Sequence, residues 1–434
     1  MLAICMTHPP LFNLGLPMGL IFPLWFALLF SPPQKTLVYE NKAYEPEIKS
    51  IQLYSEKQEV GSWLLPAVTQ LHQNDLVLEF DDLRTDASHY YARIVHCQYN
   101  WVPSSLRDLD FMTDYNEFNI SDYAFSSNTL VPYVHYRFSL PGVKLPGNYL
   151  VVVYRDGNQS DIILSYRFMV YEGRTRLAQD NRAAGALALR STNQQLNFTV
   201  DYKGLEILNP YESVHVVVRQ NQRWDNARFD MKPSFVRESQ HQIEYRLFDN
   251  DKFFTAGNEF RFVDFRSINF PGQNTDRIDK RASPYHLWVR PDQPRASEAY
   301  SQYPDINGKF HIENLDNGSS ETASDYVNAT FVLESPELEK AKVYVVGAFN
   351  QWVKSQESQM TYDVASGTYQ NTQLLKQGWY NYLYLVEGTR YLPYHFEGSH
   401  FETENFYEVF FYYRPFQPNA DMLVGYFPIT INAR

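Results

Sequence analysis

The stretch Tyr149-Leu150-Val151-Val152-Val153-Tyr154 decides the fold, because its β-branched and aromatic residues favour a strand. Turn-forming residues bound it on both sides, with Pro146-Gly147-Asn148 before it and Asp156-Gly157-Asn158 after it. Runs of the same kind, with period-two patterning, recur at Leu76-Val77-Leu78-Glu79-Phe80, Val214-His215-Val216-Val217-Val218 and Val343-Tyr344-Val345-Val346. We therefore predict an all-β fold built from tandem β-sandwiches.

Helical periodicity is scarce by comparison, and its best example is the short segment 177–188. No strand opens into a helix through a Gly-rich phosphate loop. The pattern therefore excludes an α/β nucleotide-binding fold.

The composition limits the class of protein. Of the 434 residues, 44% are hydrophobic and 20% are charged, so the chain can bury real cores and is not disordered. The 33 tyrosines favour half-buried strands, in which the ring packs inward and the hydroxyl reaches water. A net charge of −12 argues against a nucleic-acid partner, because phosphate contacts need a basic face.

The N-terminal segment has the character of an export signal. The first charged side chain is Lys35, and the stretch 20–30 is almost wholly apolar. This stretch is shorter than the roughly 20 residues that cross a bilayer, and Pro17 and Pro23 interrupt the wider segment. We predict a signal-peptide-like leader over 1–34, with a retained membrane anchor as the alternative, and a mature chain without a membrane span.

Only two cysteines occur, Cys5 in the predicted leader and Cys97. We therefore expect no internal disulfide in the mature chain, which excludes a cross-linked secreted scaffold. Cys97 is expected to be a small buried core residue.

Composition shifts and turn-rich stretches divide the rest of the chain into blocks. Each of the three larger blocks is near the size of an immunoglobulin-like sandwich. We predict sandwiches over 35–172, 191–292 and 324–415, followed by a C-terminal tail over 416–434.

The third block carries the most distinctive local pattern, VYVVGAFNQW at 343–352, followed by a hairpin and another alternating strand. It resembles the early-set sandwich domains of glycogen-binding modules. The resemblance implies that Asn350 and Trp352 project from a turn, that Trp352 stacks on a sugar ring, and that Tyr391 supplies a second ring. Leu383 stands where that family has a sugar-facing Lys. A periplasmic glycan-binding protein is therefore our alternative hypothesis, and Trp352 as a packed corner of the sandwich is the competing interpretation.

A longer set of segments carries a second resemblance, beginning with 90–104 and 122–129. These segments resemble the first domain of the type IX secretion system plug protein family of the Bacteroidetes. Segments that recur in that family in the same order follow at 223–227, 256–262, 305–308 and 397–405. The resemblance runs from about Tyr39 to Tyr426.

The second resemblance implies a function without catalysis. It implies a periplasmic protein, associated with the outer membrane, that binds the secretion translocon barrel and occludes its periplasmic mouth. Trp101 and Trp224 lie in predicted exposed turns, and we expect them to anchor this contact because Trp dominates binding hot spots. The competing interpretation is that both rings complete their own cores.

The residues give no support to an enzyme. Asp81-Asp82 follows an apolar strand and is most simply a turn opener. His96 and Cys97 are adjacent on a predicted strand, so their side chains point to opposite faces. The histidines lack zinc-site spacing, and no Gly-x-Ser-x-Gly elbow occurs. We therefore predict no catalytic residue, metal, cofactor or small-molecule ligand.

Overall fold

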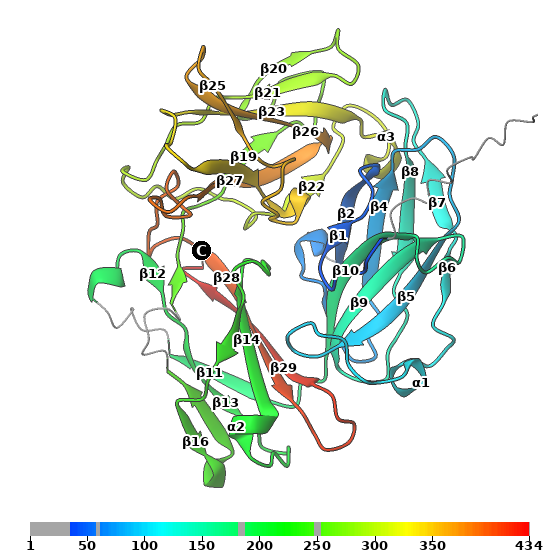
Figure 1. Cartoon of the computed structure of the whole chain (residues 1–434), viewed down its shortest axis with the longest axis vertical. Helices are drawn as coiled ribbons and strands as arrows, with labels where there is room; N and C mark the ends of the chain where they lie inside the picture. The colour runs from blue at the N-terminus through cyan, green and yellow to red at the C-terminus, as the bar shows by residue number, and fades with distance from the viewer. Residues whose placement is uncertain (1–34, 58–60, 181–186, 247–252, 434) are drawn as a thin grey trace, which may run out of the picture. The chain divides into compact units, whose positions relative to one another are not determined.

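The protein is built almost entirely from β-strands, as the sequence predicts (Figure 1). The computed structural model describes residues 35–57, 61–180, 187–246 and 253–433. The predicted leader over 1–34 lies outside the described residues. Among the described residues, no helix is both long and apolar enough to span a bilayer.

The first sandwich packs two sheets around one apolar core. Its larger sheet has the order β1-β10-β9-β5-β6, with β3 also paired to β10, and its second sheet has the order β2-β4-β8-β7. The strands are β1 (Lys42–Ala43), β2 (Ile48–Ser55), β3 (Val68–Gln70), β4 (Leu76–Asp82), β5 (Tyr90–Cys97), β6 (Phe118–Ile120), β7 (Asp122–Phe125), β8 (Val134–Ser139), β9 (Gly147–Arg155) and β10 (Ile162–Tyr171).

The second sandwich is discontinuous in sequence. Its sheets have the orders β11-β13-β17-β16 and β15-β14-β28-β29, and β12 pairs with β18. The strands are β11 (Arg176–Asp180), β12 (Asn193–Gln194), β13 (Asn197–Asp201), β14 (Val214–Gln220), β15 (Arg228–Met231), β16 (Phe235–Arg237), β17 (Gln242–Tyr245), β18 (Phe254–Thr255), β28 (Asn405–Tyr413) and β29 (Met422–Ile431).

The third sandwich is inserted between β18 and β28. One sheet has the order β19-β27-β22 with β24 also paired to β27, and the other has the order β20-β21-β23-β26-β25. The strands are β19 (Arg261–Asp264), β20 (Thr275–Asp279), β21 (His286–Val289), β22 (Phe310–Ile312), β23 (Tyr326–Glu334), β24 (Lys342–Val346), β25 (Thr361–Asp363), β26 (Thr368–Lys376) and β27 (Gly378–Glu387).

Helical elements are single turns between strands. The α-helical turns are α1 (Asp108–Phe111), α2 (Pro210–Ser213) and α3 (Ser320–Ala323), and the 3₁₀ turns are η1 (Ser62–Leu64), η2 (Leu187–Leu189), η3 (Glu238–Gln240) and η5 (Ala348–Asn350). The helical periodicity at 177–188 is wrong over 177–180, because these residues belong to β11, which pairs with β13, and residues 181–186 lie outside the described part of the chain. Sheet pairing overrides a weak local preference there.

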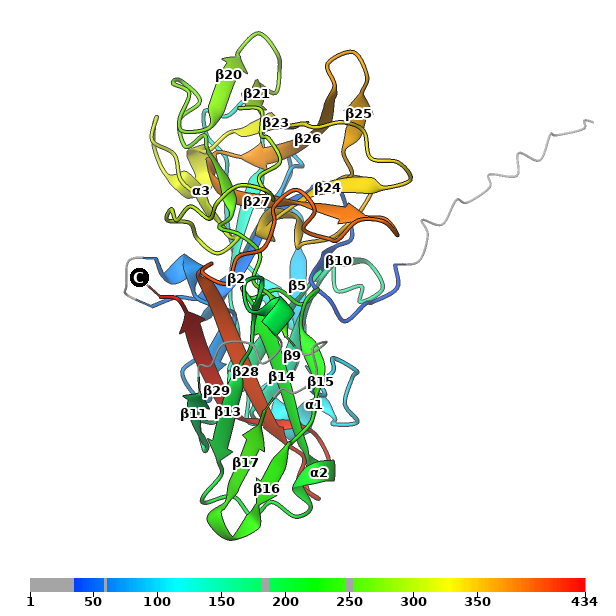
Figure 2. The same ribbon diagram turned by 90° about the vertical axis from the view of Figure 1, so that its left-hand side faces the viewer.

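Strand pairing divides the chain at points other than the predicted blocks. β20 and β21 fall within the predicted block 191–292, yet they belong to the third sandwich. β28 falls within the predicted block 324–415 and pairs with β14 in the second sandwich, beside it in both views (Figures 1 and 2). The predicted tail, 416–434, contains β29, which closes the same sheet. These domain boundaries depend on pairing between strands that are distant in sequence, and local composition does not reveal that pairing.

The largest fully buried side chains are tyrosines, and most of their hydroxyls form hydrogen bonds inside the protein, whereas the Tyr245 hydroxyl has no partner among the described residues. The Tyr382 hydroxyl donates to Asp292 at 2.7 Å, and the Tyr412 hydroxyl donates to Asn148 at 2.8 Å. The prediction that tyrosine hydroxyls reach water is therefore wrong for these rings. Cys97 is buried, as predicted.

Candidate functional site: the cavity between the sandwiches

The two tryptophans that we expected in exposed turns pack against each other. Trp101 follows β5 and is 3% exposed, and Trp224 follows β14 and is half-buried. Their ring centroids lie 4.9 Å apart at an interplanar angle of 82°. Both rings join an apolar cluster that links the first sandwich to the β14-β28-β29 sheet, so the expected exposure is wrong for Trp101. They complete a core between sandwiches, which a local turn pattern does not reveal.

Arg167, on β10, lies over this pair of rings. Its Cζ atom is 4.6 Å from the Trp101 ring centroid and 5.3 Å from that of Trp224, which places both rings in cation–π range. Its Nε donates to the Tyr39 carbonyl oxygen at 2.7 Å. Burial lowers the pKa of Arg167 to about 10. Within the described ranges, no carboxylate forms an ion pair with it.

A second arginine beside Trp224 is fully compensated. Arg219, on β14, is buried, and its Cζ lies 4.4 Å from the Trp224 ring centroid. Glu408 on β28 accepts from Arg219 Nε at 2.5 Å and from Nη2 at 2.8 Å. This bidentate ion pair neutralises Arg219, so its charge is not available to a further anion.

Lys309, just before β22, contributes another cation from the third sandwich. Its Nζ donates to the carbonyl oxygens of Leu64 at 2.5 Å and Leu65 at 3.2 Å. Burial lowers the pKa of Lys309 to about 7. In the part of the chain that the structure describes, no carboxylate lies within ion-pair distance of its ammonium group.

These groups face one cavity of about 420 Å³, formed by residues of all three sandwiches. The volume lies within the usual range for small-ligand sites. The cavity is lined by Glu40, Asn41, Leu53, Ala67, Tyr166, Arg167, Arg219, Asn221, Gln222, Trp224, Asp225, Lys309, Ala348, Gln351, Trp352, Val353 and Lys354.

The remaining charged groups of the cavity have partners or lie at its exposed edge. Asp225 accepts from Arg223 Nη2 at 2.6 Å, and Lys354 donates to Glu387 at 3.2 Å. Glu40 is exposed. Arg167 and Lys309 are therefore the two cations of the lining without a carboxylate partner among the described residues.

Trp352 forms part of the cavity wall but does not present an open platform. It is 8% exposed, and the Arg223 guanidinium lies 4.2 Å from its ring centroid. Gly308 lies against the same ring, since a Cβ built there would come within 2.4 Å of it. The competing interpretation, a packed corner, matches this environment.

The other residues of the glycan hypothesis have structural partners. The Asn350 side chain accepts from the Gly347 amide at 3.1 Å and donates to the Val345 carbonyl at 3.0 Å, so it stabilises its own turn. Tyr391 is half-buried and packs edge-on against His395 at 4.9 Å. Trp352 and Tyr391 therefore do not form the exposed pair of rings that sugar stacking needs.

Two buried ionic networks, which our sequence analysis missed, connect distant segments. In the first, Glu397 lies between Arg261 and Arg295, with Nε–O distances of 3.1 Å and 2.7 Å, and its own backbone carbonyl accepts from Asn258 at 3.0 Å. The segments 256–262 and 397–405 thus meet in space, at the two crossings between the second and third sandwiches. Both segments belong to the plug resemblance, and this was the one signal in the sequence that could have drawn attention to them.

The second network joins the first and third sandwiches. Asp81, on β4, is buried and accepts from Lys376 Nζ at 2.7 Å and from the Tyr326 hydroxyl at 2.6 Å. His135 Nδ1 lies 2.8 Å from the same carboxylate. The prediction that Asp81-Asp82 opens a turn holds for Asp82, which ends β4 and accepts from the Arg84 amide at 3.2 Å, but it is wrong for Asp81, whose carboxylate belongs to this network.

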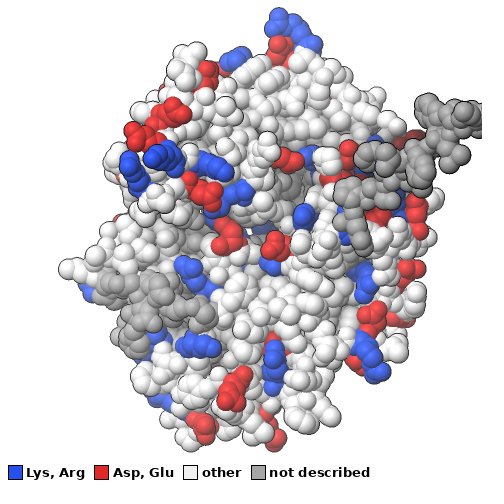
Figure 3. Space-filling view, in the orientation of Figure 1, with Lys and Arg blue, Asp and Glu red and all other residues white. Residues whose placement is uncertain are grey.

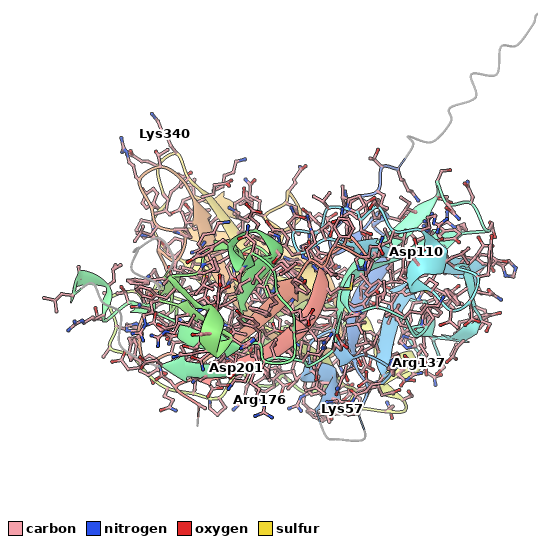
Figure 4. The ribbon with its side chains drawn as sticks, turned by 90° about the horizontal axis from the view of Figure 1, so that it is seen from below. Lys57, Asp110, Arg137, Arg176, Asp201 and Lys340 are labelled. Carbon is pink, nitrogen blue, oxygen red and sulfur yellow. The ribbon has the colours of Figure 1, made fainter. Side chains whose placement is uncertain are left out.

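No set of three or more His, Cys, Asp or Glu side chains in the described ranges is arranged to hold a metal ion. Over the face shown in Figure 3, basic and acidic side chains are interspersed. Figure 4 shows the chain from below, with Lys340 extending from the loop before β24. This mixed surface suits a water-soluble body.

Comparisons with known proteins match the first sandwich to a family model. The family described as "Type 9 secretion system plug protein 1st domain" matches residues 48–172, which include β2 to β10. The whole structure is similar to the crystal structure of a hypothetical protein from Parabacteroides merdae ATCC 43184, with a TM-score of 0.84 and 27% sequence identity. That similarity covers 91% of this chain and 100% of the other chain. No curated protein matches the chain. Residues 48–172 of the chain are therefore similar to the first domain of type 9 secretion system plug proteins.

Proposed function

We propose that this chain is a non-enzymatic periplasmic protein that binds the outer-membrane translocon of the type IX secretion system and plugs its periplasmic opening. The observation that carries the proposal is the plug first domain at residues 48–172. The matched family is a secretion-system domain and not an enzyme family.

The interior supports a body that keeps its shape. A stopper for an aqueous pore has to resist deformation while its surface stays soluble. The ion pair between Asp81 and Lys376 connects the first and third sandwiches, and the pair between Arg219 and Glu408 stabilises the sheet that packs on the first. Buried pairs of this kind are costly to break, so they favour one arrangement of the sandwiches.

Because Trp101 is buried, we propose that other aromatic residues of the first domain contact the translocon. Tyr123 and Phe125, on the edge strand β7, are 45% and 55% exposed, and their ring centroids lie 6.0 Å apart. Tyr115, in the same domain, is 81% exposed. Exposed aromatics on an unpaired strand edge are suited to a protein contact.

We expect the protein to co-purify from gently solubilised envelopes with a very large outer-membrane barrel, and its deletion to make the outer membrane leaky to large antibiotics. Tyr123→Ser combined with Phe125→Ser should weaken the complex by about 30-fold, if these rings supply about 2 kcal/mol. Val364→Ser, which alters an 81% exposed residue of the third sandwich, is the matched control and should leave capture unchanged. Recovery of the protein alone from every gentle extract, with an intact permeability barrier in the deletion strain, would contradict the proposal.

The glycan hypothesis has a separate test in the intrinsic fluorescence of the purified chain. We expect α-glucans at millimolar concentration to leave the emission unchanged, because Arg223 and Gly308 cover the Trp352 ring. A saturable shift that disappears in Trp352→Ala would instead support sugar binding.

A further inference from the structure

The cavity between the sandwiches contains a charge imbalance that the plug function does not explain. Arg167 and Lys309 both line it, and among the described residues neither has a carboxylate partner. Removing a cation from water without a counter-charge is costly, so proteins usually pair such groups. The neighbouring Arg219 shows the usual solution, because the Glu408 carboxylate accepts from two of its nitrogens.

The two cations also present chemistry that complements an oxyanion. A guanidinium offers a planar fork of N–H donors, and an ammonium offers a compact charge with three donors. Arg167 uses its Nε for the Tyr39 carbonyl, and its two terminal nitrogens carry the remaining donors. Lys309 gives two of its three donors to the carbonyls of Leu64 and Leu65, which fixes its head group.

The rest of the wall combines aromatic and aliphatic side chains with the amides of Asn41, Asn221, Gln222 and Gln351. Tyr166, Trp224 and Trp352 contribute rings, and Leu53 and Ala348 contribute aliphatic groups. A site with a few placed charges in such a wall takes a ligand that has an anionic head and an apolar body. The volume of about 420 Å³ accommodates a molecule of the size of a small aromatic acid or the end of a peptide.

We propose that this cavity binds an organic oxyanion, whose carboxylate or phosphate oxygens lie between Arg167 and Lys309 and whose apolar part packs against Trp224. Because the cavity is formed by residues of all three sandwiches, the ligand contacts each of them and stabilises their arrangement. The proposal is independent of the translocon contact, and it replaces our prediction that the chain takes no small-molecule ligand.

Binding should depend on pH through Lys309. Burial lowers the pKa of Lys309 to about 7, so its ammonium loses its proton as the pH rises through neutrality. An anion stabilises the charged form, so binding should take up protons at neutral pH and weaken by about tenfold between about pH 6 and about pH 8. The other titratable groups that line the cavity are Glu40, Tyr166, Arg167, Arg219, Asp225 and Lys354. The Glu408 carboxylate, which pairs with Arg219, also acts on Lys309 and opposes the effect of burial on its pKa.

The test uses the mature chain and isothermal titration calorimetry with four probes. Phenyl phosphate and benzoate carry an anion and a ring, and inorganic phosphate carries an anion alone. A short peptide that ends in a Phe carboxylate, compared with its amide, tests a chain end as the source of the oxyanion. We expect at least one ring-bearing anion to bind about tenfold more tightly than inorganic phosphate, and the peptide amide not to bind.

The variants separate the site from general electrostatics. Lys309→Gln and Arg167→Gln should each weaken binding by about tenfold or more. Lys309→Gln should also remove the pH dependence of benzoate binding, because the benzoate carboxylate keeps its charge between about pH 6 and about pH 8. Lys340→Gln removes the same charge from an exposed position outside the cavity lining and should change affinity by less than about twofold. Thermal melts of each variant identify any that fails to fold. Absence of heat and of thermal stabilisation for all probes up to about 10 mM, or equal losses in Lys309→Gln and Lys340→Gln, would overturn the proposal.

Discussion

Replacing Glu397 with Gln is expected to lower the free energy of unfolding by about 3–5 kcal/mol. The carboxylate is 1% exposed and binds both Arg261 and Arg295, and its Oε1 also accepts from the Tyr384 amide at 2.9 Å. A neutral amide leaves Arg295 buried without a carboxylate, whereas Arg261 keeps Asp292 at 2.8 Å. Urea denaturation followed by circular dichroism measures the change.

The matched control is Glu339→Gln, which breaks an exposed pair with Arg390. Exposed pairs contribute about 0–1 kcal/mol, so this variant should unfold at nearly the wild-type urea concentration. If both variants lose the same small amount of stability, the Glu397 network does not have the role assigned to it.

The same network predicts a pH dependence. Burial alone would raise the pKa of Glu397, but the Arg261 and Arg295 guanidinium groups outweigh burial and hold that pKa below its ordinary value of 4.5. The unfolded chain therefore binds a proton at higher pH than the folded one. The stabilisation is complete above the unfolded pKa and is lost as pH falls through the folded one. Over this acid range, the stability of Glu397→Gln should fall less steeply than that of the wild type.

Lys376→Met is expected to have a comparable effect, with a loss of about 3–5 kcal/mol. Lys376 is 2% exposed, and its ammonium lies 2.7 Å from Asp81 and 4.1 Å from the centroid of the Tyr133 ring. Methionine retains the packing but leaves the Asp81 carboxylate buried, with His135 and Tyr326 as its remaining partners. Chemical denaturation in urea at low and high salt measures the loss.

Salt separates this buried pair from a surface pair. Ionic screening acts weakly on buried charges, so the loss in Lys376→Met should persist at about 1 M salt. Lys354→Met breaks the exposed pair with Glu387 and should change stability by less than about 1 kcal/mol at either salt concentration. A Lys376→Met loss that disappears in high salt would place the pair at the surface and contradict its burial.

The prediction of strands succeeded where the evidence is local. The apolar runs at 149–154 and 343–346 fall within β9 and β24, because β-branched residues between turn signals suit a pleated surface almost regardless of context. The plug resemblance at 90–104 and 122–129 was likewise local and is confirmed over 48–172. The block boundaries had no such local signal. They depend on the pairing of β14 with β28, and the whole third sandwich lies between these two strands in sequence.

The candidate site was the part that sequence could identify least. Trp224 and Trp352 were noted as single aromatics, but nothing near either in sequence shows that they line one cavity with Arg167 and Lys309. Lys309 belongs to no motif that would have singled it out. Its importance comes from the burial of its ammonium group and from the absence of an ion-pair partner in the described ranges, and neither can be read from neighbouring residues.

The sequence by itself determined that this protein is made of β-strands and resembles a secretion-plug first domain, since strand patterning and family segments are properties of neighbouring residues. Only the tertiary structure decided that the C-terminal hairpin completes the second sandwich and that Trp101 is buried between sheets. It alone brought two cations without carboxylate partners in the described ranges into one cavity. The physical reason is that burial and charge compensation depend on contacts between residues hundreds of positions apart, and such contacts leave no periodic pattern along the chain.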